Sequence, residues 1–312
     1  AEEGEVLDSA PMQRLRGIRQ LGTAHLVYPG ATHTRFEHSI GTLHMAHLMC
    51  AAIRSAALER PADLAGIDPG AERRIRLAAL VHDLSHIPFG HGLEDQSGLL
   101  ERHDTPSRLA RAVGEGEAGQ LLDALGVRSE VLAILGAGGR EIPPCWRELL
   151  DGTIGADILD YLARDSYFTG LSLRYDPRVL GLFQVDRKSG RLFVDVSKRG
   201  MLREDALSEV LRVLEARYYF SERVYYHHAK VTAGALLTRA IEEALDAGEL
   251  DEAALFAHTD ESLLAALCAS ACERAARFAG LYRRRRLPKR AAVYPAYLNR
   301  ERQPELLARF FT

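Results

Sequence analysis

Hydrophobic residues recur every three or four positions along most of this chain, which is the spacing of one buried face of an α-helix. Between residues 35 and 54, for example, Phe36, Ile40, Leu43 and Cys50 follow this spacing. Similar stripes occupy residues 75–86, 154–168, 206–229 and 233–247. The pattern therefore predicts a mainly α fold.

Two short segments break the helical pattern. Residues 182–186 and 191–196 flank the turn-like sequence Arg187-Lys-Ser-Gly190, which is typical of a small β-hairpin. After residue 247 the chain becomes rich in alanine and arginine. We therefore expect a core at residues 1–247 and a helical C-terminal extension at residues 248–312, with a soft boundary between them.

The amino-acid composition excludes some classes of protein but does not indicate one function. The 312 residues, 47% of them hydrophobic, can bury a large core. The net charge of −3 is no sign of a general nucleic-acid binder, so any affinity for nucleic acid would be local. The chain has neither an apolar run of about 18 residues nor a basic stretch followed by a long apolar one. We therefore expect no membrane partner and a cytoplasmic location.

The most specific chemical signal is the sequence Leu80-Val-His82-Asp83-Leu-Ser-His86-Ile-Pro-Phe-Gly-His91. A histidine and an aspartate side by side in an apolar stretch are costly to bury unless a partner compensates them, and a divalent cation would do so. We expect His82 and His86 one turn apart on a helix that Pro88 ends, with His91 in the following turn.

Two further segments would complete a metal site. Upstream, His38 lies at the start of the first long helical stripe. Downstream, Asp157, Tyr161 and Asp165 follow one another at steps of four and so share one helix face. On spacing alone, a solvated face with salt bridges explains these acids equally well. The order of these residues along the chain, a His, then an adjacent His-Asp pair, then an Asp, favours a metal site.

This order, with the adjacent His82 and Asp83, resembles the HD superfamily and specifically its dNTP triphosphohydrolase branch. The likeness is to members that also carry a SAM domain, which we do not expect in these residues. The matching stretches are residues 13–22, 28–39, 80–91, 157–165 and 217–227. The resemblance implies an HD-domain helical core with one divalent metal ion. The ligands of that ion would be His38, His82, Asp83 and Asp157, a set that suits Mn, Fe, Co, Ni, Zn or Mg.

The resemblance also implies that three histidines, His86, His91 and His103, face the scissile phosphate. Hydrolysis needs a proton donor for the leaving oxygen, and a histidine with a pKa near neutrality suits that role. We favour His103 as the donor, with Asp104 as its orienting partner. We expect His86 and His91 to contact phosphate oxygens.

Seven positions match substrate-binding residues of the family, namely Gln20, Leu21, Arg35, Tyr161, Asp165, Arg217 and Tyr225. The two arginines would grip phosphate with their planar guanidinium groups. Gln20 and Asp165 would bond the 3′-hydroxyl of a sugar, and Tyr161 would crowd out a 2′-hydroxyl. Tyr225 would stack on the sugar, although packing among the neighbouring aromatic residues would explain it more simply without the resemblance.

The chain departs from the family at Ile158, where the triphosphohydrolases carry a lysine that helps to hold the phosphate tail. We therefore expect weak discrimination among mono-, di- and triphosphates. Asp8, Gln13 and Arg16 match positions around the family's guanine-nucleotide activator site, but helix capping and packing explain them equally well.

Together these features predict a metal-dependent phosphohydrolase that acts on nucleotides. Its leading form is a dNTP triphosphohydrolase, which releases a deoxynucleoside and tripolyphosphate. The alternatives are an HD-type phosphatase or phosphodiesterase that removes phosphates singly and, in a different class, a nucleotide-binding regulator with little turnover. The expected partners are the nucleotide substrate and further copies of the chain in a homo-oligomer.

Overall fold

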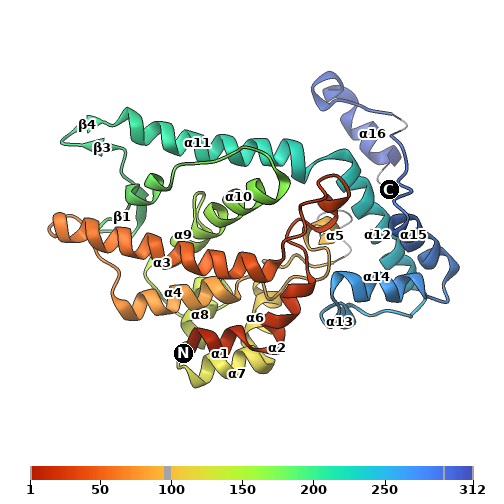
Figure 1. Cartoon of the computed structure of the whole chain (residues 1–312), viewed down its shortest axis with the longest axis horizontal. Coiled ribbons are helices and arrows are strands. Elements are labelled where there is room, and N and C mark those ends of the chain that lie inside the picture. The colour runs from red at the N-terminus through yellow and green to blue at the C-terminus, as the bar shows by residue number, and fades with distance from the viewer. Residues whose placement is uncertain (1, 95–99, 291, 311–312) are drawn as a thin grey trace.

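The computed structural model describes residues 2–94, 100–290 and 292–310, and these are built mostly of helices (Figure 1). The α-helices are α1 (Glu2–Leu7), α2 (Ala10–Arg14), α3 (Arg35–Glu59), α4 (Pro69–Val81), α5 (His91–Glu94), α6 (Pro106–Gly114), α7 (Gly116–Ala124), α8 (Arg128–Ile134), α9 (Pro144–Asp151), α10 (Ala156–Thr169), α11 (Glu204–Phe220), α12 (His228–Asp246), α13 (Glu252–Leu255), α14 (Asp260–Cys268), α15 (Glu273–Arg283) and α16 (Gln303–Phe310). Shorter helical turns are η1 (Leu15–Gly17), η2 (Gly22–Leu26), η3 (Pro177–Leu182), η5 (Ala296–Leu298), η6 (Arg300–Arg302) and the π-helical η4 (Ser221–Tyr225). The predicted mainly α fold is confirmed.

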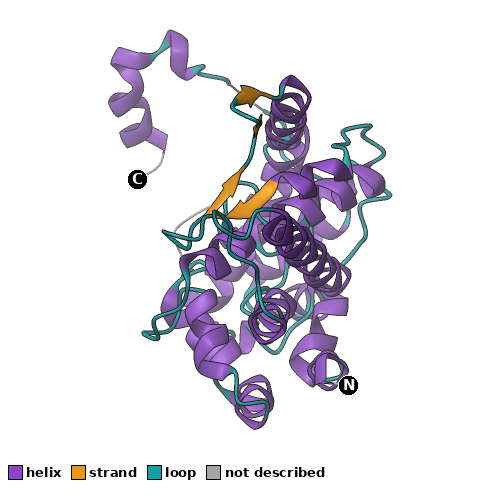
Figure 2. Ribbon diagram, turned by 90° about the vertical axis from the view of Figure 1, so that its left-hand side faces the viewer, coloured by secondary structure: helices purple, strands orange, loops and turns teal. Residues whose placement is uncertain are grey.

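The predicted hairpin is also confirmed. Strands β1 (Phe183–Val185) and β2 (Leu192–Val194) pair antiparallel, with Gln184 opposite Phe193. A second, unpredicted ladder joins β3 (Ser197–Lys198) to β4 (Met201–Leu202). Figure 2 shows both ladders as small additions to a helical body. Within the described residues, no helix is both long and apolar enough to cross a membrane.

The long helix α3 organises the core around the site. It begins with a capping box, in which the Glu37 carboxylate accepts a hydrogen bond from the Thr34 backbone N–H at 2.6 Å. Helices α4 and α10 both pack against α3, and the three bury one continuous apolar cluster that includes Met49, Ile75 and Leu159. The start of α3, the end of α4 and the start of α10 therefore meet.

A second apolar cluster joins the C-terminal helices to the HD segment. Leu236 and Ile241 of α12 and Leu263 of α14 pack in one cluster with Ile87 and Phe89, which follow the His-Asp pair. Figure 1 shows α12, α14 and α15 side by side next to the main helical body. The boundary at residue 247 stays a prediction, and the cluster spans it.

Helix α4 ends earlier than the pattern predicted. We expected the helix to continue to His86, but its last residue is Val81. The chain then tightens into turns, in which the backbone N–H of Leu84 donates to Val81 O and that of His86 donates to Asp83 O, at 3.1 Å in each case. Pro88 has no N–H and disfavours helical geometry at Ile87, so no helix could continue past that residue.

The predicted stripe at residues 206–229 is likewise not one helix. The π-helical turn η4 follows α11, and α12 begins afresh at His228. The side chain of His227 caps α12 by accepting from the Ala229 N–H at 3.2 Å.

Candidate metal centre and substrate pocket

Imidazole and carboxylate groups from three helices converge at one point. His38 lies in the first turn of α3, His82 and Asp83 directly follow α4, and Asp157 lies in the first turn of α10. His38 Nε2 is 3.3 Å from His82 Nε2 and 2.9 Å from Asp157 Oδ1. His82 Nε2 is 3.5 Å from Asp83 Oδ1. Ligands bound at about 2.0–2.2 Å to one ion lie about 3 Å apart, so these separations fit a single cation.

Each histidine is oriented by the nitrogen that faces away from this point. His38 Nδ1 is 2.8 Å from Asp160 Oδ2, and His82 Nδ1 is 2.7 Å from Ala79 O. Because both partners accept hydrogen bonds, Nδ1 of each ring donates to its partner, and Nε2 is the nitrogen that faces the shared point. Asp160 is held in turn by Nε and Nη2 of Arg164, both at 2.9 Å.

The electrostatics of the centre favour a positive charge. Burial lowers the pKa of His38, but hydrogen bonds to Asp157 and Asp160 outweigh burial and raise that pKa to about 10. Burial raises the pKa of Asp157, but hydrogen bonds from His38 and His82 outweigh it and hold that pKa well below its usual range. Donor types, separations and charge therefore fit a divalent metal ion.

Three further histidines line a cavity of about 380 Å³ beside this centre. The rings of His86 and His103 are stacked, with centroids 3.7 Å apart, and His91 meets them edge-on at 5.1 and 4.6 Å. Nitrogens of the three rings lie within 4.8 Å of one another, which is close enough for a cation. The same ring nitrogens would also suit several oxygens of a phosphate.

The residue that orients His103 is Glu94, which was not assigned a role from the sequence. His103 Nδ1 donates to Glu94 Oε2 at 2.8 Å, and Arg108 Nη2 donates to Glu94 Oε1 at 3.0 Å. We expected Asp104 in this role, but its carboxylate accepts from Arg102 Nε at 3.1 Å and is half exposed. A buried carboxylate such as that of Glu94 is costly without hydrogen-bond donors, whereas water can solvate the exposed carboxylate of Asp104. Its place three residues after His91, on one helix face, is the signal that could have found it.

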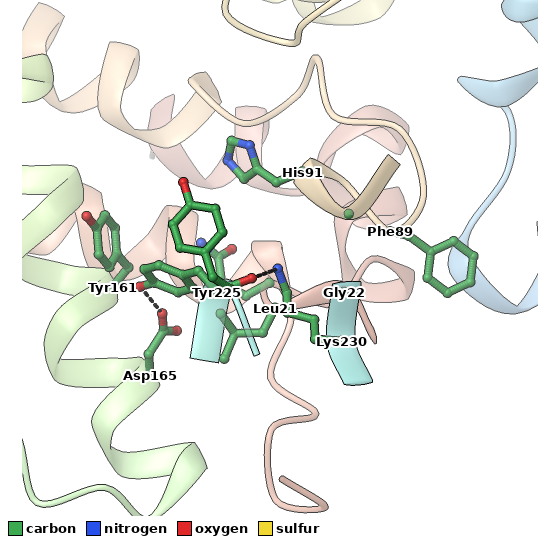
Figure 3. A pocket seen from close by; sticks show the side chains of 11 residues that line it. Leu21, Gly22, Phe89, His91, Tyr161, Asp165, Tyr225 and Lys230 are labelled. Carbon is green, nitrogen blue, oxygen red and sulfur yellow. Dashed lines mark hydrogen bonds between the residues drawn. The ribbon is translucent and has the colours of Figure 1, made fainter. Parts of the chain in front are cut away.

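A second cavity of about 250 Å³ opens next to the first (Figure 3). Five of the predicted substrate residues line it, namely Gln20, Leu21, Tyr161, Asp165 and Tyr225. The two cavities share Gln20, His91 and Tyr161 as wall residues. A ligand in the second cavity would therefore lie directly beside the metal centre.

Asp165 is held from two sides within this second cavity. Tyr225 OH donates to its Oδ2 at 2.9 Å (Figure 3), and His33 Nε2 donates to its Oδ1 at 2.8 Å. A carboxylate can accept about four hydrogen bonds, so Asp165 retains capacity for a ligand hydroxyl. Lys230 also lines the cavity, with Nζ donating to Tyr225 O at 3.2 Å. Neither His33 nor Lys230 was assigned a role from the sequence.

The two predicted phosphate-binding arginines lie in different surroundings. Arg35 lines the metal-side cavity, is 2% exposed, and donates from Nη1 to Asp83 Oδ2 at 2.7 Å. Arg217 is exposed and lines neither of the two cavities, and its Nη1 donates to Thr153 O at 3.4 Å. Ile158 is buried in the main apolar cluster.

The residues that resembled an activator site are engaged locally. Gln13 Nε2 donates to Leu7 O at 2.8 Å, and Arg16 Nε donates to Gln13 Oε1, also at 2.8 Å. The Arg16 guanidinium lies 3.6 Å from the centroid of the Phe36 ring. These contacts are those of packing side chains.

Comparison with known proteins identifies two family regions in the chain. Residues 35–143 match the HD domain and residues 193–303 match the HD-associated region. The uncharacterized protein MJ1154 of Methanocaldococcus jannaschii is 31% identical over 253 residues, which cover 80% of this chain and 48% of that protein. The deoxynucleoside triphosphate triphosphohydrolase SAMHD1 homolog of Dictyostelium discoideum is 31% identical over 180 residues, which cover 54% of this chain and 34% of that protein.

A solved structure shows the same fold along the whole chain. The crystal structure of a hypothetical protein from Aquifex aeolicus is 25% identical, with a TM-score of 0.77 over 100% of this chain and 79% of that one. The chain spans about half the length of MJ1154. With an HD domain followed by an HD-associated region, and with helices that bring the His and His-Asp elements together, this chain belongs to the HD superfamily.

Proposed function

We propose that this chain is a metal-dependent phosphohydrolase of nucleotides, with dNTP triphosphohydrolysis as its leading activity. The observation that carries the proposal is the continuity of the two cavities, which share Gln20, His91 and Tyr161. A nucleoside in the cavity lined by Asp165 and Tyr225 would extend its 5′ phosphate ester toward the metal centre. The Dictyostelium relative, named as a dNTP triphosphohydrolase, supports this choice of substrate.

His38, His82, Asp83 and Asp157 would hold one divalent cation. When bound, such an ion supplies Lewis-acid chemistry, since it lowers the pKa of water and neutralises a phosphate oxygen. Arg35 fixes the Asp83 carboxylate through its Nη1 contact. Its buried Nε has no hydrogen-bond partner among the described residues, so a phosphate oxygen could satisfy it.

His103 is proposed to protonate the leaving oxygen. Its Nδ1 is committed to Glu94, which leaves Nε2 as the nitrogen that delivers a proton. His86 and His91, which lie against it, would contact the non-bridging phosphate oxygens.

The sugar would be recognised on the opposite side of the shared wall. Asp165 would accept from the 3′-hydroxyl, and the side-chain amide of Gln20 would bond the same hydroxyl; the amide oxygen Oε1 is buried without a hydrogen-bond partner among the described residues. Tyr161 would exclude a 2′-hydroxyl, while Leu21 and Tyr225 would pack against the ring. Arg217 lines neither cavity but lies beside Tyr161, a residue of their shared wall, and from there its guanidinium would bind a phosphate oxygen.

A second candidate is a phosphatase that removes phosphates one at a time. The observation that favours it is Ile158, because a buried apolar side chain stands beside Asp157 where the triphosphohydrolases carry a lysine. A charge-assisted hydrogen bond contributes about 1.5–3 kcal/mol, so without it triphosphate affinity would fall by roughly one to two orders of magnitude.

Product analysis separates the two candidates. The chain is incubated with dGTP or dATP and, in turn, Mn, Mg, Co, Ni, Zn or Fe, and the products are resolved by anion-exchange chromatography. Deoxynucleoside with tripolyphosphate supports the triphosphohydrolase, whereas successive diphosphate and monophosphate support the phosphatase. No product with any metal, from a chain that binds both metal and nucleotide, would favour a nucleotide-binding regulator.

A further inference from the structure

A buried carboxylate from the HD-associated region lies directly behind the nucleotide site. Asp260, the first residue of α14, is 1% exposed. It accepts hydrogen bonds from two backbone N–H groups, that of Arg19 at 3.0 Å and that of Phe89 at 2.8 Å. Arg19 immediately precedes Gln20, and Phe89 lies between His86 and His91. One side chain therefore holds both loops that line the proposed site.

The same loops approach each other too closely for ordinary side chains. A Cβ on Gly22, whose φ is +53°, would lie 2.7 Å from Phe89 O. A Cβ on Gly17 would lie 2.4 Å from Cγ2 of Thr259, the N-cap residue of α14. The start of α14 and the two loops thus form one tightly packed unit, so a shift in any of them moves the others.

Phe89 needs this support because of its backbone conformation. Its φ of +61° is in the left-handed region, which is unfavourable for a residue with a bulky side chain. Asp260 fixes its N–H, and its ring meets that of Tyr282 in α15 edge-on at 5.7 Å. Both supports come from the HD-associated region.

A second bridge joins the same elements. Arg14 donates from Nη2 to His86 O at 2.8 Å and from Nε to His258 O at 3.1 Å. It therefore links the histidine loop to the residues just before α14, independently of Asp260.

From these contacts we propose that Asp260 is a positioning residue for the nucleotide site, through which the HD-associated region sets the relative placement of the Gln20 and His86–His91 loops. The proposal rests on the proposed function for its kinetic consequences. The adjacent Glu261 provides a matched control. It pairs with the side chain of the same Arg19, at 2.8 Å, but is 72% exposed.

The first test measures the contact itself. Asp260→Asn keeps the size of the side chain but leaves one carbonyl oxygen, which cannot accept from both N–H groups in the same way. Native-state hydrogen exchange followed by NMR should show faster exchange at Arg19 and Phe89 in Asp260→Asn than in wild type. Glu261→Gln should leave both rates unchanged, and metal content should be equal in all three proteins.

The second test measures the consequence for turnover. With dGTP and the activating metal, Asp260→Asn should lose about 10- to 100-fold in kcat/KM, mainly in kcat, because misplacement of the reacting groups by about 1 Å costs up to that much. Glu261→Gln should stay within about twofold of wild type. Exchange rates and kcat/KM in Asp260→Asn that match those of Glu261→Gln would overturn the proposal.

Failure of the proposed function and failure of the positioning role give different results. If wild type hydrolyses no nucleotide, the proposed function fails while the exchange rates still decide whether Asp260 holds the two loops. If Asp260→Asn does not fold, Arg14→Met tests the second bridge, and we expect it to lose kcat with metal retained. Failure of both variants to fold, with Glu261→Gln intact, would identify a general folding requirement and overturn the positioning role.

Discussion

At the residue scale, the metal centre depends on what each imidazole contacts on its far side. His38 is backed by Asp160 and His82 by the carbonyl of Ala79, so both rings present Nε2 to the same point. These outer contacts fix the ring orientation before any ligand binds. The sequence and its resemblance to the HD superfamily predict the four ligands, whereas Asp160 and the carbonyl of Ala79 become their neighbours only in the tertiary structure.

Replacing His82 and Asp83 together by alanine should abolish bound metal and phosphohydrolase activity, because two of the four proposed ligands are removed. Elemental analysis and circular dichroism would show loss of metal with helix content largely kept. A matched control is His47→Ala, which removes an imidazole bonded to Glu72 at 2.6 Å elsewhere on α3 and should leave the metal bound. Full metal occupancy in the double variant would rule out this ligand set.

His103 and Glu94 should be separable by the pH dependence of kcat. Burial and His86 lower the pKa of His103, whereas Glu94 partly offsets them. A general acid works only when protonated, so activity falls as pH rises through this pKa. Glu94→Gln removes the offsetting charge and should move that fall to lower pH, whereas His103→Ala should lower kcat by about two to four orders of magnitude. A pH profile that Glu94→Gln leaves unmoved would contradict the pairing.

At the scale of elements, the site is built where helices end. The turns after α4 place Asp83 and His86 at a point that a continuing helix would not reach, because each further helical residue turns by about 100°. The start of α14 then closes the back of the site through Asp260. The positions where helices end therefore matter as much for the geometry of the site as the helices themselves.

Asp260 should also make stability depend on pH. Burial, only partly offset by the N–H groups of Arg19 and Phe89, raises the pKa of this carboxyl from 3.8 to about 6. The folded state then binds a proton that the unfolded state has lost, so this contribution is present below about pH 4 and is lost as pH rises through 6. The pKa difference corresponds to about 3 kcal/mol.

The asparagine in Asp260→Asn cannot ionise. The free energy of unfolding of this variant, relative to that of wild type, should therefore rise between pH 4 and 7 by up to about 3 kcal/mol. Urea unfolding of both proteins at each pH measures this difference, in which the other titrating groups cancel. A difference that stays constant across the range would show that the Asp260 carboxyl ionises normally in the folded chain.

At the scale of the whole molecule, the segment that follows the His-Asp pair passes from the main apolar cluster, which contains Leu84, to the second one. Ile87 and Phe89 pack with α12, α14 and α15 rather than with the main core. The HD domain and the HD-associated region are therefore joined beside the site as well as in the main core, where Val213 and Phe220 of α11 pack.

A chain cut after residue 247 should consequently misfold or aggregate. It would expose Leu236, Leu237 and Ile241, each of which contributes about 1.5–3 kcal/mol when buried. A chain cut after residue 290 keeps α14 and α15 and should remain folded. Size-exclusion chromatography with thermal unfolding compares the two, and a stable monomeric fold for residues 1–247 would contradict this account.

The sequence by itself determined the mainly helical fold and the hairpin at residues 183–194, because both depend on local periodicity, while its resemblance to the HD superfamily led to the proposed metal ligands. The tertiary structure decided which partner compensates each buried charge. Glu94 rather than Asp104 accepts the hydrogen bond of His103 Nδ1, and the Asp260 carboxylate accepts from the backbone N–H groups of Arg19 and Phe89. Local pattern specifies which side chains share a face, but a buried charge is compensated by whatever group the fold brings to it, here across as many as 241 residues of sequence.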